Sequence, residues 1–120
     1  MARILLADDD DATRDLVRRA LETDGHAVHV TEDGSAALDA LMGTTSPFDL
    51  LITDVQMPSL DGISLVERAV AHTPGLRIIL MSGFPEQLGR AASLGARRLE
   101  IVTKPFTLEQ IRARVRTSLA

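Results

Sequence analysis

Acidic side chains gather at one point of this chain, directly after a short apolar run. In the stretch ILLADDDDAT the aspartates Asp8, Asp9, Asp10 and Asp11 follow one another without a break. Two carboxylates about 4 Å apart repel by roughly 4 kcal/mol at an effective dielectric constant near 20, and a cation between them relieves that repulsion. Oxygen ligands without histidine or cysteine favour a hard ion, and Mg²⁺ takes few carboxylates. The stretch therefore predicts a divalent-cation site.

Three further polar side chains follow apolar runs. Asp54 comes after DLLIT, Ser82 after RIILM, and Lys104, the one lysine of the chain, after LEIVT. Asp8 and Asp9 together with Asp54 would complete the cation site, and a carboxylate can also attack phosphorus to form an aspartyl phosphate. The cation, the ammonium and the hydroxyl would then spread over the three transferred oxygens. The simpler alternatives are a turn hydroxyl at Ser82 and a surface lysine in a turn.

Alternating apolar runs and amphipathic segments predict the elements that position these residues. We expect strands at residues 3–7, 27–31, 49–53, 77–81 and 99–103. We expect helices at residues 12–23, 34–42, 62–72 and 86–94, and a last helix with the apolar stripe Leu108, Ile111, Val115 and Leu119. This alternation indicates a parallel sheet covered on both faces, in which ligands bind at the carboxyl ends of the strands.

Two of the four consecutive aspartates also have a structural explanation. Asp10 and Asp11 fall where the first helix should begin, so their oxygens can cap it and their charge suits the helix dipole. Asp33 is a candidate cap of the second helix for the same reason.

Composition narrows the function classes. The 120 residues predict a single domain spanning 1–120, and the absence of cysteine excludes disulfides, zinc thiolates and thiol nucleophiles. A net charge of -4 argues against direct nucleic-acid binding. No apolar run approaches the roughly 20 residues of a membrane span, so we expect a cytoplasmic protein without a membrane partner. The three histidines, His26, His29 and His72, are too scattered to form a metal cluster.

Four stretches in a fixed order carry a family resemblance. ILLADDD, DLLITDVQMPSLDG, ILMSGF and VTKPF make the sequence similar to the receiver domains of two-component response regulators, the CheY-like family, over essentially the whole chain. The resemblance implies a flavodoxin-like (βα)5 fold, a three-layer sandwich whose five-stranded parallel sheet has the order 2-1-3-4-5. MARILLADDD and the MSGF and KPF stretches are also similar to the single-domain CpdR-like regulators.

The same resemblance implies roles for the polar residues. Asp54 is the implied phosphoacceptor, Ser82 the switch hydroxyl and Lys104 the contact to the phosphoryl group. The implied Mg²⁺ ligands are Asp9, Asp54 and the backbone carbonyl of Gln56, with Asp8 acting through water. Pro105 resembles the proline that follows a cis peptide bond, and Met57-Pro58 and Asp61-Gly62 resemble the turn into the third helix.

Four features of the sequence affect how the signal would be read. Ile101 stands where the family often has Tyr or Phe, so an aromatic flip there is excluded. About two additional residues lie between Gly95 and Lys104, which predicts an altered loop. Phe84 and Gln56 occupy positions that tune the lifetime of the acyl phosphate; Phe84 either shields the phosphoryl group or simply packs on the fourth helix.

The resemblance also implies partners. A histidine kinase or histidine phosphotransferase would dock near the first helix and present a phosphohistidine, and an unknown downstream protein would read the face of the fourth helix, fifth strand and fifth helix. Arg112 and Arg116 would either contact an acidic partner or form a solvated face. The expected catalysis is limited to intrinsic autophosphorylation and autodephosphorylation.

Two alternatives remain. Asp9-x-Asp11-x-Thr13 has the form of the haloacid dehalogenase phosphatase motif, but the chain is short, Glu109 is the only acidic residue after the lysine, and Asp54 would have no role. A degenerate receiver that binds partners without phosphorylation would not need the full set of polar residues.

Overall fold

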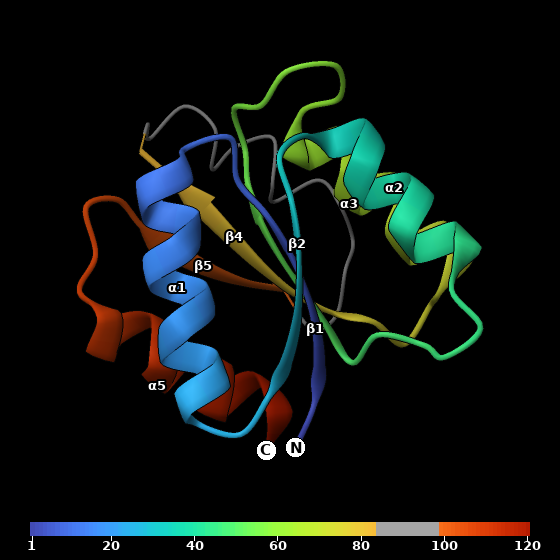
Figure 1. The fold of residues 1–120 in the computed structure, drawn as a ribbon. Coiled ribbons are helices and arrows are strands. Elements are labelled where there is room, and N and C mark those ends of the chain that lie inside the picture. The colour runs from blue at the N-terminus through green and yellow to red at the C-terminus, as the bar shows by residue number, and fades with distance from the viewer. Residues whose placement is uncertain (84–98) are drawn as a thin grey trace.

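The structure is a computed structural model and describes residues 1–83 and 99–120 (Figure 1). The strands are β1 (Arg3–Ala7), β2 (Ala27–Thr31), β3 (Leu50–Asp54), β4 (Arg77–Ser82) and β5 (Leu99–Thr103). The helices are α1 (Asp11–Thr23), α2 (Gly34–Gly43), α3 (Gly62–His72) and α5 (Leu108–Leu119). The helix expected at residues 86–94, the role of Phe84 and most of the altered loop after Gly95 lie outside the described residues.

The five strands form one parallel sheet in the order β2-β1-β3-β4-β5, which confirms the order that the family resemblance implied. The register keeps the carboxyl ends of the central strands level. Ala7 is opposite Thr53, and Asp54 is opposite Met81. Asp54 and Ser82 are the last residues of their strands, whereas the sequence predicted that each would directly follow its strand.

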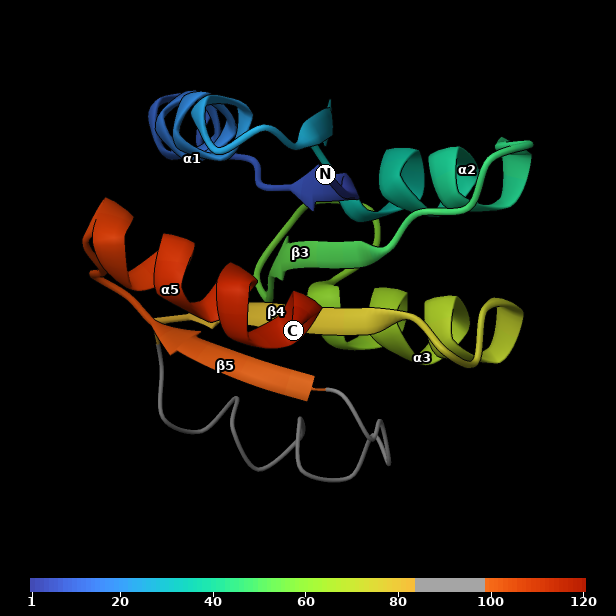
Figure 2. The same cartoon turned by 90° about the horizontal axis from the view of Figure 1, so that it is seen from below.

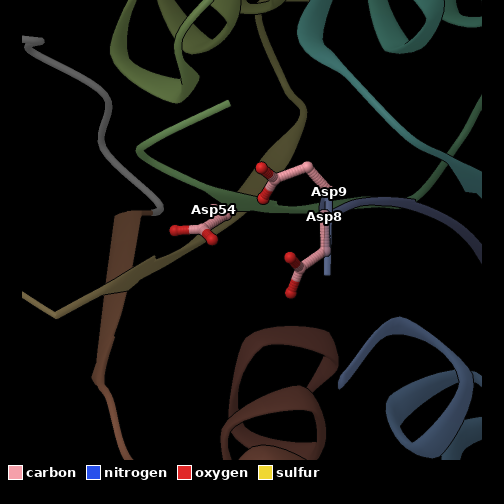
Figure 3. Close-up of side chains that lie close together, drawn as sticks. All are labelled: Asp8, Asp9 and Asp54. Atoms are coloured by element: carbon pink, nitrogen blue, oxygen red, sulfur yellow. The ribbon is translucent and has the colours of Figure 1, made fainter. Parts of the chain in front are cut away.

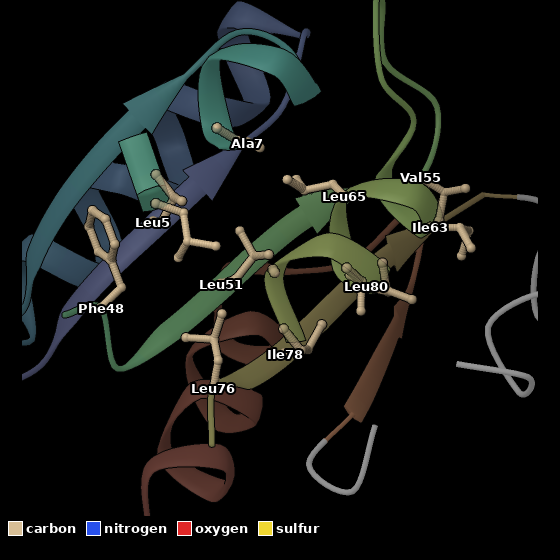
Figure 4. Packing of buried hydrophobic residues seen from close by; sticks show 14 residues of the cluster. Leu5, Ala7, Phe48, Leu51, Val55, Ile63, Leu65, Leu76, Ile78 and Leu80 are labelled. Atoms are coloured by element: carbon tan, nitrogen blue, oxygen red, sulfur yellow. The ribbon is translucent and has the colours of Figure 1, made fainter. Parts of the chain in front are cut away.

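Helices cover both faces of the sheet, as expected for a three-layer sandwich (Figure 2). Alternate side chains along each buried strand point to opposite faces, and each set meets a different helix pair. The core beneath α2 and α3 contains Leu5, Leu51, Ile63, Val66, Ile78 and Leu80, several of which are drawn in Figure 4. The core beneath α1 and α5 contains Ile4, Leu6, Val17, Leu21, Ile52, Ile79, Ile111 and Val115. These two cores fix the position of the carboxyl end of the sheet, where the polar residues lie.

Side chains that follow the strands also start the helices. Asp10, Asp33 and Asp61 each accept a hydrogen bond from the backbone N–H three residues later, and α5 begins with a reciprocal capping box between Thr107 and Gln110. The predicted capping roles of Asp10 and Asp33 are confirmed. In the described parts of the chain no helix is long and apolar enough to cross a bilayer.

Candidate functional site

Three carboxylates converge where β1 and β3 end. Asp8, Asp9 and Asp54 each offer an oxygen, and these oxygens all lie within 4.8 Å of one another (Figure 3). Asp8 is fully buried and Asp54 is 9% exposed, whereas Asp9 faces solvent. The sequence predicted this convergence. Its structural cause is that β1 and β3 are adjacent and in register.

Asp8 has one satisfied oxygen and one that no described donor satisfies. Its Oδ1 accepts a hydrogen bond from the backbone N–H of Asp10 at 2.9 Å. Its Oδ2 is buried and has no hydrogen-bond partner among the described residues. Burial, the largest effect, raises the pKa of Asp8, and the nearby Asp54 charge acts in the same direction. An acceptor left in this state, beside two other carboxylates, fits a hydrated hard cation.

Lys104 reaches the same carboxylates from the end of β5. Its Nζ donates a 2.8 Å hydrogen bond to Asp54 Oδ2 and lies 3.7 Å from Asp8 Oδ2. Burial lowers the pKa of Lys104, but the bond to Asp54 and the surrounding carboxylate charges outweigh it, so the pKa is raised overall. The ammonium therefore stays charged and partly neutralises the acidic group.

The backbone around Lys104 fixes its approach. The Lys104 N–H donates to the Ser82 carbonyl at 2.8 Å, and the Lys104-Pro105 peptide bond is cis, as the resemblance implied. Ser82 itself is 3% exposed and ends β4, opposite Thr103. The structure thus brings Ser82 to the strand edge that Lys104 and Asp54 share.

The loop that carries Gln56 leaves β3 directly after Asp54. Gln56 is exposed, and the loop closes through a 2.7 Å hydrogen bond from Gly62 N to the Val55 carbonyl. A Cβ on Gly62 would lie 2.0 Å from the Asp54 carbonyl oxygen, so this position has no room for a side chain. The Asp61-Gly62 turn of the resemblance therefore has a steric cause, a close approach of α3 to the backbone of Asp54.

Two nearby residues were not predicted as part of the site. The Arg14 side chain is 14% exposed, and its Nη1 donates to the Asp8 carbonyl at 2.8 Å while its Nη2 contacts Asp11. The spacing of Asp11 and Arg14, three residues apart on a helix, was the available sequence signal. Ser59, in the loop after β3, has a left-handed backbone with φ 67° and gave no such signal.

Two arginines of α5 form ion pairs within the chain. Arg112, expected either to contact an acidic partner or to be solvated, makes two hydrogen bonds to the carboxylate of Asp24, at 2.9 and 2.6 Å. Arg116 bonds Glu109 at 2.8 Å. Both guanidinium groups already have acidic partners within the chain: Arg112 reaches Asp24 because α5 packs beside the end of α1, and the Arg116 pair lies within α5 itself.

A groove of about 450 Å³ adjoins the site, between α1 and the segment that follows β5. Asp10 and Lys104 line its polar end. Leu16, Phe106 and Leu108 line its apolar part, and Leu16 and Leu108 are 52% and 39% exposed. The groove therefore offers an apolar contact surface beside the acidic group.

Comparison with known proteins agrees with this geometry. Residues 4–116 match the response regulator receiver domain family. The chain is 38% identical to the response regulator receiver protein CpdR of Brucella abortus, over 92% of this chain and 91% of that protein. It is 37% identical to the response regulator MprA of Mycolicibacterium vanbaalenii over 98% of this chain, but spans only 50% of that longer protein.

Solved structures show the same relationship. The chemotaxis response regulator CheY4 of Vibrio cholerae is 28% identical with a TM-score of 0.87, and 99% of each chain is covered. The receiver domain of the hybrid histidine kinase CckA is 29% identical with a TM-score of 0.83, covering 98% of this chain and 99% of that one. Sequence, strand order and acidic edge agree, and this chain belongs to the response regulator receiver domain family.

Proposed function

We propose that this chain is a phosphoacceptor receiver in which Asp54 takes a phosphoryl group from a histidine kinase or a histidine phosphotransferase. Asp8, Asp9, Asp54 and the backbone carbonyl of Gln56 would hold Mg²⁺. The observation that carries the proposal is the meeting of three carboxylate oxygens within 4.8 Å, with Lys104 Nζ 2.8 Å from Asp54. Residues 1–120 would form a single domain.

The transfer step uses one oxygen of Asp54 as the nucleophile. Lys104 occupies Oδ2, so Oδ1 is left to attack phosphorus; the bond from phosphorus to the histidine nitrogen breaks as the bond to Asp54 forms. Mg²⁺, when bound, supplies positive charge to the transferred oxygens. Lys104 then exchanges its contact with Asp54 for one with a phosphoryl oxygen, and the Ser82 hydroxyl donates to another.

The groove beside α1 supports docking of the phosphodonor. Its exposed leucines, Leu16 and Leu108, supply apolar contact area, and its polar end opens at Lys104. A helical phosphotransferase surface laid along it would bring a phosphohistidine to Asp54. Apolar residues of this kind form the centre of protein interfaces.

The conformational change that follows phosphorylation would begin at Lys104 and Ser82. Both residues are joined to β5, Ser82 by strand pairing and Lys104 by direct continuation, so a contact made to the phosphoryl group pulls on that strand. The half-buried Ile101 packs against the core below and cannot respond as an aromatic switch would. A downstream protein would read the rearranged surface of β5 and α5.

Chemical phosphorylation tests the proposal. Incubation with acetyl phosphate and Mg²⁺, followed by intact mass measurement, should add one phosphoryl group to the wild-type chain and none to Asp54→Asn. A beryllofluoride titration checks the same site independently. Labelling of Asp54→Asn at the wild-type level would refute the proposal.

Two further variants separate the receiver from the phosphatase alternative. Asp11, the second acid of the phosphatase motif, begins α1 and contacts Arg14 rather than joining the acidic group. Asp11→Asn should therefore label normally, although a phosphatase would require this residue. Asp9→Asn should weaken the response to Mg²⁺ while Asp54 remains the modified residue; a phosphatase would instead lose its nucleophile at Asp9.

A further inference from the structure

The loop between β3 and α3 rests on the first turn of α2 (Figure 1). Ser59 Oγ donates to Asp33 Oδ1 at 3.3 Å and accepts a hydrogen bond from Ser35 N at 3.4 Å. The Leu60 carbonyl occupies the space beside Gly34, where a Cβ would lie 1.9 Å from its oxygen. Side-chain and backbone contacts therefore join the Gln56-bearing loop to a helix that contributes no ligand.

The loop has an unfavourable backbone at this contact. Ser59 lies in the left-handed region with φ 67°, and Leu60 N donates to the Pro58 carbonyl at 2.8 Å, which closes a tight three-residue turn. A non-glycine residue keeps such a conformation when surrounding contacts hold it there. Those contacts are the ones to the first turn of α2.

The chain just before α2 also contacts the other acidic loop. Asp8 N donates to the Thr31 carbonyl at 3.2 Å, and Thr31 Oγ1 donates to the Leu6 carbonyl at 3.1 Å. Asp33, two residues later, uses its Oδ1 both for Ser59 and as the cap of α2, accepting from Ala36 N at 2.8 Å. Residues 31–35 thus touch both loops that carry the carboxylates.

We propose that residues 31–35 act as a positioning clamp that sets the separation of the two acidic loops. By holding Ser59 and Leu60, the clamp keeps the Asp54 and Gln56 side of the site at a fixed distance from Asp8. The inference rests on the function proposed above, because the clamp acts through that metal site. Its members are positioning residues; none of them belongs to the acidic group itself.

A pair of glycine substitutions in α2 tests the clamp. In Gly34→Ala the new Cβ must move from 1.9 Å to at least 3.0 Å from Leu60 O, a shift of about 1.1 Å between helix and loop. Displacements of this size weaken positioned chemistry by up to about 100-fold, and we expect Mg²⁺ affinity to fall about 10- to 100-fold. In Gly43→Ala, at the other end of the same helix, the Cβ meets nothing within 4 Å, and affinity should not change.

A milder serine pair tests the polar contact. Ser59→Ala removes the hydroxyl that bonds Asp33, so Mg²⁺ affinity should fall about two- to tenfold, the range expected for one hydrogen bond. Ser35→Ala keeps the backbone N–H that donates to Ser59 Oγ, and this variant should bind Mg²⁺ as the wild type does. Mg²⁺ titrations followed by amide chemical shifts give the dissociation constant and report folding in the same spectra.

The outcomes separate the two proposals. Absence of Mg²⁺-dependent shifts in the wild type would refute the metal site, and with it the proposed function. Normal binding by the wild type together with unchanged affinity in folded Gly34→Ala and in Ser59→Ala would refute the clamp alone. If Gly34→Ala does not fold, Ser59→Ala decides. A role limited to stability would lower the melting temperature without changing the dissociation constant.

Discussion

Replacing Asp8 by asparagine should stabilise the metal-free protein, because burial disfavours the charged carboxylate and the neighbouring carboxylates repel it. Asp9 and Asp54 oxygens lie within 4.8 Å of Asp8, so each of those charges repels it by about 3.5 kcal/mol at an effective dielectric constant near 20. Lys104, 3.7 Å away, attracts Asp8 by about 4.5 kcal/mol on the same scale. The three terms leave a net repulsion of about 2.5 kcal/mol.

Solvent reduces this difference, since Asp9 is exposed and its charge is screened. We therefore expect Asp8→Asn to raise the free energy of unfolding by about 1–2 kcal/mol in the absence of divalent ions. For a chain of this length each kcal/mol corresponds to about 3–6 °C in melting temperature. The asparagine oxygen can still accept the bond from Asp10 N, so the local turn is retained.

Thermal unfolding in chelator and in excess Mg²⁺ measures the effect. The chain has neither tryptophan nor tyrosine, so far-ultraviolet circular dichroism is the suitable probe. Wild type should gain stability on adding Mg²⁺, and Asp8→Asn should gain much less. Asp11→Asn, exposed and outside the acidic group, serves as the matched comparison and should show no stabilisation in chelator. An Asp8→Asn protein less stable than wild type in chelator would refute the reasoning.

Three other substitutions have expected outcomes. Lys104→Met should bind Mg²⁺ more tightly, because a competing cation is removed. It should also accept phosphate from acetyl phosphate about 10²–10³-fold more slowly. Calorimetry measures the Mg²⁺ affinity and timed mass spectra measure the phosphorylation rate; an affinity and a rate that change in the same direction would contradict this prediction. Gly62→Ala should lose about 1–3 kcal/mol of stability in urea titrations, since the Cβ would strike the Asp54 carbonyl. The bond to Arg112 lowers the pKa of Asp24 below its usual 3.8, so the pair stabilises the fold at higher pH and that contribution is lost as pH falls through the lowered value. Arg112→Gln should therefore lower the urea midpoint at pH 7, and this difference from wild type should shrink below pH 3.8 and disappear once the pH lies below the lowered pKa of Asp24; a constant difference would exclude the pair as its cause.

Much of the fold could be predicted from local patterns. Strand boundaries followed from apolar runs, and the described helices followed from amphipathic spacing, to within about one residue. Asp8, Asp9 and Asp54 could be predicted to meet because parallel strands end at the same edge. Lys104 joined them for the same reason, and its 2.8 Å contact with Asp54 is the clearest example.

Contacts between loops could not be predicted in this way. In the sequence Gly34 is an ordinary helix start. Only the folded chain shows that the carbonyl of Leu60 occupies the space that a side chain at this position would need. Ser59 likewise has no pattern that indicates a left-handed turn held by Asp33. Arg14 shows as a helix-surface ion pair in the sequence, whereas its bond to the Asp8 carbonyl depends on how α1 leaves β1. Such contacts depend on the distance between segments, which periodicity does not encode.

The single lysine gives the acidic pocket an internal counter-ion. With its ammonium between Asp54 and Asp8, the resting pocket carries less excess negative charge than three carboxylates alone would impose. We therefore expect the resting protein to fold without a metal, and in the proposed function a divalent ion would act on the reactivity of Asp54 rather than on the existence of the fold. A regulator that works as proposed would keep its inactive shape when magnesium is scarce, and would lose only its capacity to be switched.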